Sequence, residues 1–249
     1  MNDLQNTAQE KNVLRWGGLA GMLGSILMVV TFVFVPVFVT VETSAAYLIE
    51  RLPEMRVRRT IENGLFLAVV ILWVPHFLAL YRALWRESLA PALFGSVLGI
   101  MGLVALAAQS AHHSATLPLS NLYHAPGTTP EEQATLVFLW QATMGMLEAV
   151  LVIGFVLVPI GLICLGVAML RAPAFGKGFG AAGVVLGALG LGGASLMFVA
   201  PASILGPVSS FFTLIIFHFV LGWKVHSLSR APYAAPELVE RMDAPGVME

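Results

Sequence analysis

The sequence has little charge and one cysteine. Charged residues make up 11% of its 249 residues, against about 25% in an ordinary soluble domain. The net charge of −1 gives no general attraction for nucleic acid, so no nucleic-acid partner is expected. Cys164 has no second cysteine to pair with inside this chain, which excludes an intrachain disulfide. The scarcity of charge argues against a water-soluble globular domain.

The chain also lacks a catalytic or nucleotide-binding motif in a fitting context. No Gly-x-Ser-x-Gly turn, P-loop or dinucleotide fingerprint stands in the strand-and-helix setting that its chemistry needs. His112 and His113 are adjacent, so they lack the i, i+4 spacing of two metal ligands on one helical face. We therefore expect no cofactor from a motif, and the sequence favours a non-catalytic protein.

Long apolar stretches dominate what is present. Hydrophobic residues make up 58% of the chain. The uncharged stretches are 16–41, 63–81, 88–111, 149–170 and 178–223, and Pro201 and Pro207 divide the last into two spans. A bilayer core about 30 Å thick needs about 20 residues of helix, so each of the six is long enough or nearly so. The pattern predicts an all-α polytopic membrane protein, a bundle of six transmembrane helices.

Lys and Arg are unevenly divided between the two sides that these spans imply. If the N-terminus is cytoplasmic, the cytoplasmic side holds nine of the 13 Lys and Arg: Lys11, Arg15, Arg82, Arg86, Arg171, Lys177, Lys224, Arg230 and Arg241. The other four are Arg51, Arg56, Arg58 and Arg59. Because cytoplasmic loops carry the excess of Lys and Arg, both termini are expected in the cytoplasm. We expect a cytoplasmic segment at 1–15, the transmembrane domain at 16–227 and a disordered cytoplasmic tail at 228–249.

The loops on the outer side carry local signals. Residues 44–52 have helical spacing, which predicts a short outer interfacial helix. The polar, proline-containing loop 112–133 is expected to be irregular. Thr129 followed by Pro130 and two glutamates is typical of a helix start. This helix should run to Leu170, about 60 Å at 1.5 Å per residue. It must therefore project beyond the membrane or bend, and Pro159 is the expected kink.

Glycines follow helical faces in three of the spans. They are Gly176, Gly180, Gly183, Gly187 and Gly190, then Gly95, Gly99 and Gly102, then Gly17, Gly21 and Gly24. Small residues let helix backbones approach closely in lipid. We expect packing within the chain, with homodimerisation through one stripe as the alternative. Gly166 lies on no stripe, so its replacement by Leu is expected to be milder than that of Gly183.

Polar residues near the outer ends of the spans form a candidate ligand pocket. They are Glu148, Gln141, Gln109, His112, His113 and Glu62. A charge within the membrane is costly, so Glu148 calls for an explanation. We expect it to face the bundle interior beside an outward-opening cavity for a metal, a lipid headgroup or a small ligand. The alternative is that both histidines are solvated loop residues and that Glu148 is paired with an arginine or protonated.

Two further histidines lie inside apolar spans. His76 is in the second span and His218 is in the sixth. Imidazoles on different helices can ligate haem or a metal. The alternative, which the sequence favours, is that each is a packed and hydrogen-bonded core histidine.

The chain resembles the bacterial membrane-protein family called domain of unknown function 4386. The similar elements are Arg15 before a glycine-rich first span, an arginine-bearing outer loop, and a second span that ends in Leu80-Tyr81-Arg82-Ala83-Leu84. The resemblance covers residues 13–230 and implies no activity and no functional residues. It implies a location in the bacterial cytoplasmic membrane.

Three functions remain open from the sequence. The first is non-catalytic: binding of a ligand or lipid, or association with a membrane partner, through the outer polar pocket. The second is a small-solute or ion transporter, although the inner halves of the spans look too apolar for a continuous polar path. The third is a metal- or haem-dependent membrane enzyme that uses His76, His218, His112, His113 and Glu148.

Overall fold

A computed structural model describes residues 2–34, 44–200 and 203–230, and these residues are almost entirely helical. The helices are α1 (Asn2–Phe34), α2 (Ala45–Leu84), α3 (Leu89–Ala108), α4 (His112–Tyr123), α5 (Pro130–Arg171), α6 (Gly176–Val199) and α7 (Leu205–Ser229). The short 3-10 helix η1 (Gln109–Ala111) joins α3 to α4. All but α4 are long and apolar enough to cross a membrane, which makes six candidate spans. The expected all-α, six-span architecture is confirmed.

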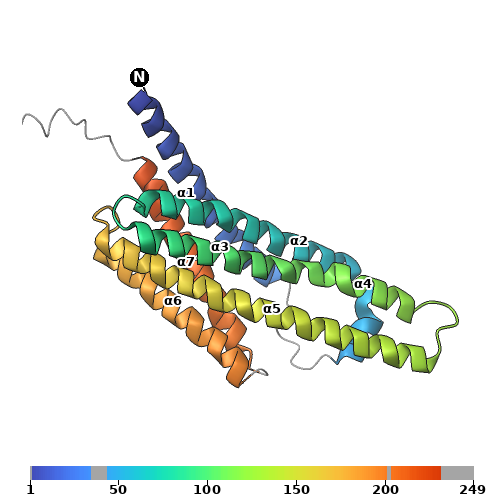
Figure 1. Ribbon diagram of the computed structural model, residues 1–249. Coiled ribbons are helices and arrows are strands. Elements are labelled where there is room, and N and C mark those ends of the chain that lie inside the picture. Colours follow the sequence, from blue (N-terminus) through green and yellow to red (C-terminus); the bar gives the residue numbers. More distant parts are fainter. Residues whose placement is uncertain (1, 35–43, 201–202, 231–249) are drawn as a thin grey trace, which may run out of the picture.

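The six spanning helices form a ring in chain order. Each packs against the next, and α7 closes the ring against α1 (Figure 1). The turns from α2 to α3 and from α5 to α6 are short, which makes these pairs of spans antiparallel neighbours. The ring encloses a core of large, fully buried side chains that include Trp73, Phe77, Phe155 and Phe217. Of the tail predicted at 228–249, Leu228 and Ser229 belong to α7, and residues 231–249 lie outside the described residues.

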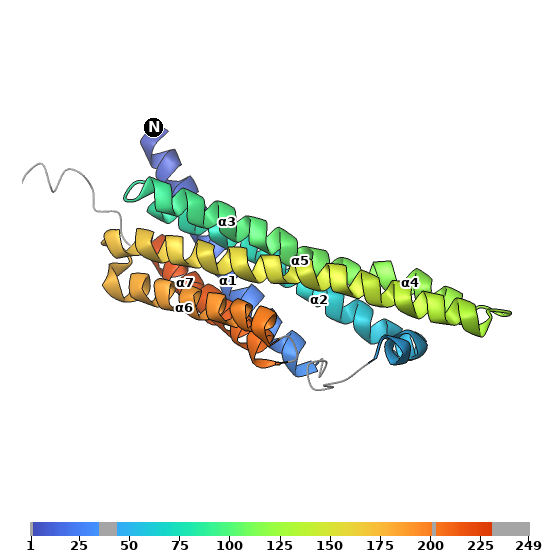
Figure 2. The ribbon, with the colours of Figure 1, turned by 60° about the horizontal axis from the view of Figure 1, so that its bottom comes forward.

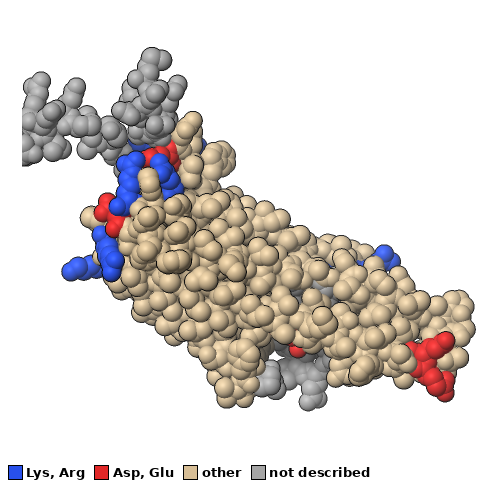
Figure 3. Space-filling model, viewed as in Figure 1, with Lys and Arg blue, Asp and Glu red and all other residues tan. Residues whose placement is uncertain are grey.

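Lys and Arg gather at one end of the bundle, which we call the basic end. It contains the start of α1, the end of α7 and the short turns between α2 and α3 and between α5 and α6. Figure 3 shows these basic residues together with a few acidic ones on the visible face, then a flank that carries little formal charge, and acidic residues at the far tip. An uncharged flank between two polar ends is what a lipid-embedded surface requires.

Three helices extend past the other end of the ring as a projection that we call the stalk. It consists of residues 45–61 of α2, helix α4 and residues 130–148 of α5 (Figures 1 and 2). The stalk has its own apolar cluster around Ile49, Leu52 and Trp140, separate from the main core. With 42 residues, α5 is about 63 Å long at 1.5 Å per residue, so it reaches well beyond a 30 Å bilayer core.

The expectation that loop 112–133 is irregular is wrong, because α4 occupies much of it. Leu117, Leu119 and Tyr123 of α4 pack on the stalk cluster. The Ser120 hydroxyl also donates a hydrogen bond to the Ile49 carbonyl at 3.0 Å. Pro118 lies inside the helix nonetheless. The contacts with α2 and α5 therefore outweigh the turn-forming tendency of the local sequence. These contacts join distant parts of the chain, so the local sequence does not reveal them.

The starts of α2 and α5 follow the sequence signals, although the short helix expected at 44–52 is continuous with the second span. The helix expected at 44–52 is the first part of α2, capped by the Ser44 hydroxyl, which accepts from the Tyr47 amide at 3.2 Å. Figure 2 shows these turns running at an angle to the rest of α2, where Pro53 lies inside the helix. Proline inside a helix removes a hydrogen bond and bends it. Helix α5 begins at a capping box formed by Thr129 and Glu132 and continues through Pro159 to Arg171.

Glycines bring α5 and α6 into backbone contact. A Cβ on Gly183 would lie 3.0 Å from the Gly166 Cα, and a Cβ on Gly187 would lie 2.7 Å from the Pro159 carbonyl oxygen. A Cβ on Gly166 would lie 2.5 Å from the Val184 nitrogen. The expectation that Gly166 tolerates substitution better than Gly183 is therefore wrong. Gly166 belongs to no glycine stripe of its own helix, α5, but it faces the glycine stripe of α6.

Candidate functional site

The expected orientation of Glu148 is not what the structure shows. The side chains of Glu148 and Gln141 are exposed on α5, and a Cβ on Gly145, which lies between them, would have no neighbouring atom within 4 Å. Helix α6 packs on α5 from Leu170 to Pro159, so it covers a part of α5 further along the chain. The prediction that Glu148 faces the bundle interior is therefore wrong. The side chains of Gln109, His112 and His113 lie outside the described part of the structure.

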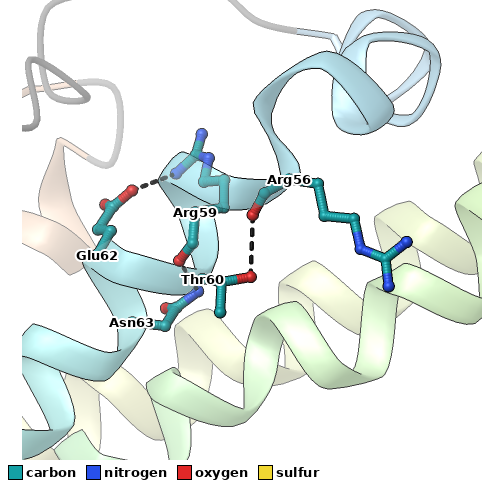
Figure 4. Close-up of polar contacts among 5 residues, drawn as sticks. All are labelled: Arg56, Arg59, Thr60, Glu62 and Asn63. Atoms are coloured by element: carbon teal, nitrogen blue, oxygen red, sulfur yellow. Dashed lines mark hydrogen bonds and ion pairs between the residues drawn. The ribbon is translucent and has the colours of Figure 1, made fainter.

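Glu62 is held on its own helix rather than aimed at the other candidates. Its carboxylate pairs with the Arg59 guanidinium at 3.4 Å, and their side chains are 17% and 23% exposed (Figure 4). The Asn63 amide donates to the Arg59 carbonyl at 2.9 Å, and the Thr60 hydroxyl donates to the Arg56 carbonyl at 2.9 Å. Arg59 of α2 thus compensates the charge of the acid that enters the second span.

The two histidines inside the spans come together. His76 of α2 and His218 of α7 are both fully buried, and their ring centroids lie 5.1 Å apart with an interplanar angle of 65°. Each lies six residues before a basic residue at the basic end, Arg82 and Lys224 respectively. At 1.5 Å per residue, the pair lies about 9 Å inside that end. The sequence named both residues but gave no sign that they are neighbours.

Aromatic rings surround the histidine pair. Trp73 stacks on His218 with centroids 4.2 Å apart and planes 8° apart. Phe77 and Phe217 meet His218 edge-on at 5.1 and 5.5 Å. Together with His76 these side chains form what we call the histidine cluster.

Glycines of α1 make room for the histidine cluster. A Cβ on Gly21 would lie 2.6 Å from Nδ1 of His76, and a Cβ on Gly24 would lie 2.7 Å from Nε1 of Trp73. The stripe that the sequence shows on the first span is therefore the wall of this cluster. The spacing of the glycines predicted that this face of the first span packs closely. It did not reveal which side chains the glycines contact.

Hydrogen bonding in the histidine cluster is incomplete. Nδ1 of His76 lies 3.2 Å from the Gly17 carbonyl oxygen. Four other buried nitrogens have no hydrogen-bond partner among the described residues: Nε1 of Trp73, Nε2 of His76, and Nδ1 and Nε2 of His218. Unpartnered polar atoms in a core are rare, because each costs about 1–3 kcal/mol. The alternative of two fully hydrogen-bonded core histidines does not fit this arrangement.

A haem held by both histidines does not fit either. Iron between two opposed imidazoles, with bonds of about 2.0 Å to each, would place the ring centroids about 6 Å apart. The observed separation is 5.1 Å, and Trp73 stacks directly on His218. The close packing leaves no space for a porphyrin between the rings. Among the described residues, no group of three or more His, Cys, Asp or Glu could hold a metal ion.

An open pocket lies at the basic end, where the start of α1 meets the end of α2. It has a volume of about 420 Å³ and is lined by Gln9, Glu10, Val13, Arg82, Trp85 and Arg86. One oxygen of the Glu10 carboxylate accepts from the guanidinium of Arg82 and, at 3.3 Å, from that of Arg86. Both guanidiniums also lie against the Trp85 ring, 4.8 and 5.6 Å from its centroid.

Of the residues that line this pocket, Arg82 and Arg86 were used to orient the chain from its sequence, and Arg82 also in the family resemblance. Arg82, Trp85 and Arg86 have i, i+3, i+4 spacing, which places them on one helical face. That spacing could have predicted that the three side chains lie close together. The partner Glu10 lies 72 residues from Arg82 in the chain, and nothing local indicates that the two meet.

The fold defines the class of the protein. Six apolar helices in a ring, with an uncharged flank and a basic end, make it an integral, multi-pass α-helical membrane protein. No protein-family model matches the chain, and no curated protein or solved structure matches it.

Proposed function

We propose that this is a non-catalytic membrane protein that binds the headgroup of an anionic phospholipid in the pocket at the basic end. The observation that supports this most is the pair of guanidiniums, Arg82 and Arg86, which share one carboxylate beside Trp85. Guanidinium groups bind phosphate with two parallel hydrogen bonds. Tryptophan is favoured at the level of the headgroups because one part of its ring system is apolar and its N–H is polar.

The charges of the pocket leave room for an anion. Two arginines face a single acid, Glu10, so the described charges of the lining sum to +1. Glu10 occupies part of the donor set and ties the start of α1 to the end of α2. A phosphate that enters the pocket competes with the Glu10 carboxylate for the same guanidinium hydrogens. Removal of that acid should therefore strengthen binding.

The location belongs to the same proposal. We place the protein in the bacterial cytoplasmic membrane, in keeping with its resemblance to domain of unknown function 4386, with the basic end and both termini in the cytoplasm. The excess of Lys and Arg at that end supports this orientation. The lipid would then come from the cytoplasmic leaflet, and the stalk would project on the other side.

The test is lipid binding by the purified full-length protein. Native mass spectrometry would compare phosphatidylglycerol with phosphatidylcholine. We expect a preference for the anionic lipid that falls about tenfold in Arg82→Gln and rises in Glu10→Gln, since a charge-assisted hydrogen bond contributes about 1.5–3 kcal/mol. Arg171→Gln is the matched control, because Arg171 is exposed at the same end outside the pocket.

The outcomes separate the proposal from its alternatives. Equal binding of both lipids by the parent chain, or an equal loss in Arg171→Gln, would show that the pocket has no headgroup specificity. Inorganic phosphate is included as a competitor. If phosphate binds as tightly as the lipid and displaces it, the ligand is a free phosphate group rather than a lipid.

A further inference from the structure

One histidine of the stalk faces two carbonyl oxygens, which is one more than a neutral ring can bond. We propose that His124 makes the stalk sensitive to pH, because only its protonated ring can bond both the end of α4 and the start of α2. His124 follows the last residue of α4 at the far end of the stalk, where the chain turns back into α5 (Figure 1). The inference does not depend on the lipid pocket, which lies at the opposite end of the molecule.

Both ring nitrogens of His124 face backbone carbonyls. Nδ1 lies 2.8 Å from the Ser120 carbonyl oxygen of α4, and Nε2 lies 3.1 Å from the Glu50 carbonyl oxygen of α2. A carbonyl oxygen only accepts, so each contact needs a proton on the ring nitrogen. The neutral imidazole carries one such proton and the imidazolium carries two. Both hydrogen bonds therefore exist together only in the protonated ring.

Loss of one proton removes one of the two bonds, whichever nitrogen loses it. If Nδ1 keeps its proton, the lone pair of Nε2 points at the Glu50 carbonyl, and a contact between residues 74 positions apart is lost. If Nε2 keeps its proton, the bond to Ser120 within α4 is lost instead. The end of α4 is therefore held more tightly at low pH and loosens as the pH rises. The side chain is exposed, so it exchanges protons directly with the solvent.

Other polar contacts at the end of α4 do not change with pH. The Ser120 hydroxyl donates to the Ile49 carbonyl at 3.0 Å, and the Gln133 amide of α5 donates to the Tyr123 carbonyl at 3.2 Å. Neither bond involves a group that titrates near neutral pH. Together with the apolar cluster of the stalk, they keep α4 in place when the ring is neutral. Protonation thus changes how tightly the end of α4 is held and leaves the fold intact.

Charged groups on the helices packed against His124 set the pH range of the test. They are Glu50, Arg51 and Glu54 of α2 and Glu131 and Glu132 of α5. Carboxyl and guanidinium groups ordinarily titrate far outside pH 6–8, whereas histidine ordinarily changes charge within that range. The other histidines of this region, His112 and His113, begin α4. They are at least 11 residues from His124, about 17 Å along the helix, and they need a control of their own.

The test is hydrogen exchange of the full-length protein in detergent at pH 6 and pH 8. Each rate is divided by the rate of an unstructured peptide at the same pH, which removes the chemical effect of pH on exchange. We expect the corrected rates of residues 120–125 to be about fivefold faster at pH 8 than at pH 6, the factor that loss of one ordinary hydrogen bond produces. Amides in the middle of the spans should show no such difference.

Substitutions of His124 separate its charge from its shape. His124→Gln has no titrating ring, so its corrected rates should be equal at the two pH values. His124→Arg carries a permanent cation with several donors, so residues 120–125 should exchange slowly at both. His226→Gln is the matched control, because His226 lies near the end of α7 and its ring faces a single carbonyl, that of Arg15 at 3.4 Å. It should keep the pH difference of the parent, as should the double variant His112→Gln and His113→Gln.

The outcomes decide the proposal in either direction. Equal corrected rates in the parent at pH 6 and pH 8, or a pH difference that persists in His124→Gln, would overturn it. Loss of the difference in the double variant would assign the effect to His112 and His113 and overturn it as well. If His124→Gln exchanges fast at both pH values and His124→Arg exchanges slowly at both, the charge of residue 124 holds the end of α4. None of these results bears on the lipid pocket, whose residues lie outside the stalk.

Discussion

At the scale of single residues, the structure separates positions that the sequence makes look alike. Gly21 and Gly145 are both glycines inside apolar helical stretches. A Cβ on Gly21 would lie 2.6 Å from His76 and 2.9 Å from the His218 carbonyl oxygen, whereas Gly145 has nothing within 4 Å. One glycine is required by close packing and the other is not, and only the tertiary contacts reveal the difference.

This contrast predicts opposite signs for the same substitution. Gly21→Ala should destabilise the protein by about 1–3 kcal/mol, because the new methyl group forces apart packed rings and backbone. Gly145→Ala should stabilise it by up to about 1 kcal/mol, because alanine has the higher helix propensity. Thermal unfolding in one detergent, followed by circular dichroism, compares the two. Equal effects would show that Gly21 has more space than the distances indicate.

At the scale of elements, α5 and its neighbours show which features local sequence predicts and which it does not. Its start at Pro130, its capping box and its length follow from local residue types, so they were predictable. The helical state of α4 was not, because it depends on Ile49 and Trp140 from other helices. The same limit explains Glu148, whose exposure depends on how the other helices pack on α5. Local signals therefore predicted the spans, while contacts between distant segments determine the candidate sites.

The cap of α5 gives an element-scale prediction. Thr129→Ala removes the hydroxyl that accepts from the Glu132 amide at 3.3 Å. Loss of such a cap costs about 0.5–2 kcal/mol. Hydrogen exchange should become faster in the first turns of α5. Thr143→Ala is the control, because its hydroxyl bonds to the Leu139 carbonyl within the helix and caps nothing. Unchanged exchange near Thr129 would contradict the capping role.

The glycine contact between α5 and α6 gives another. Gly166→Leu and Gly183→Leu should both destabilise the bundle, and to a similar extent, because a Cβ on either glycine would lie 3.0 Å or less from backbone across the contact. Gly178→Leu should be tolerated, since Gly178 has nothing within 4 Å. Unfolding temperatures of the three variants in detergent test this. A stable Gly166→Leu variant would contradict this and would support the sequence-based expectation that replacing Gly166 is milder than replacing Gly183.

At the scale of the whole molecule, the described residues form two apolar cores. The main core fills the ring of spanning helices, and the stalk cluster holds α2, α4 and α5 together beyond it. The stalk is joined to the ring through helices that continue from one to the other. Orientation in the membrane therefore decides which compartment contains the stalk and which leaflet lies beside the pocket at the basic end.

The orientation is tested by labelling single cysteines in intact cells, in a Cys164→Ser background. Ser120 is polar, but it is buried and bonded to Ile49, so a cysteine there should react poorly on either side. Ala125 is exposed at the tip of the stalk, and Asn12 is exposed near the basic end. With the excess of Lys and Arg in the cytoplasm, Ala125→Cys should react with an impermeant maleimide and Asn12→Cys should react only after lysis. Labelling of Asn12→Cys in intact cells would contradict this orientation and would place the pocket at the basic end in the outer leaflet.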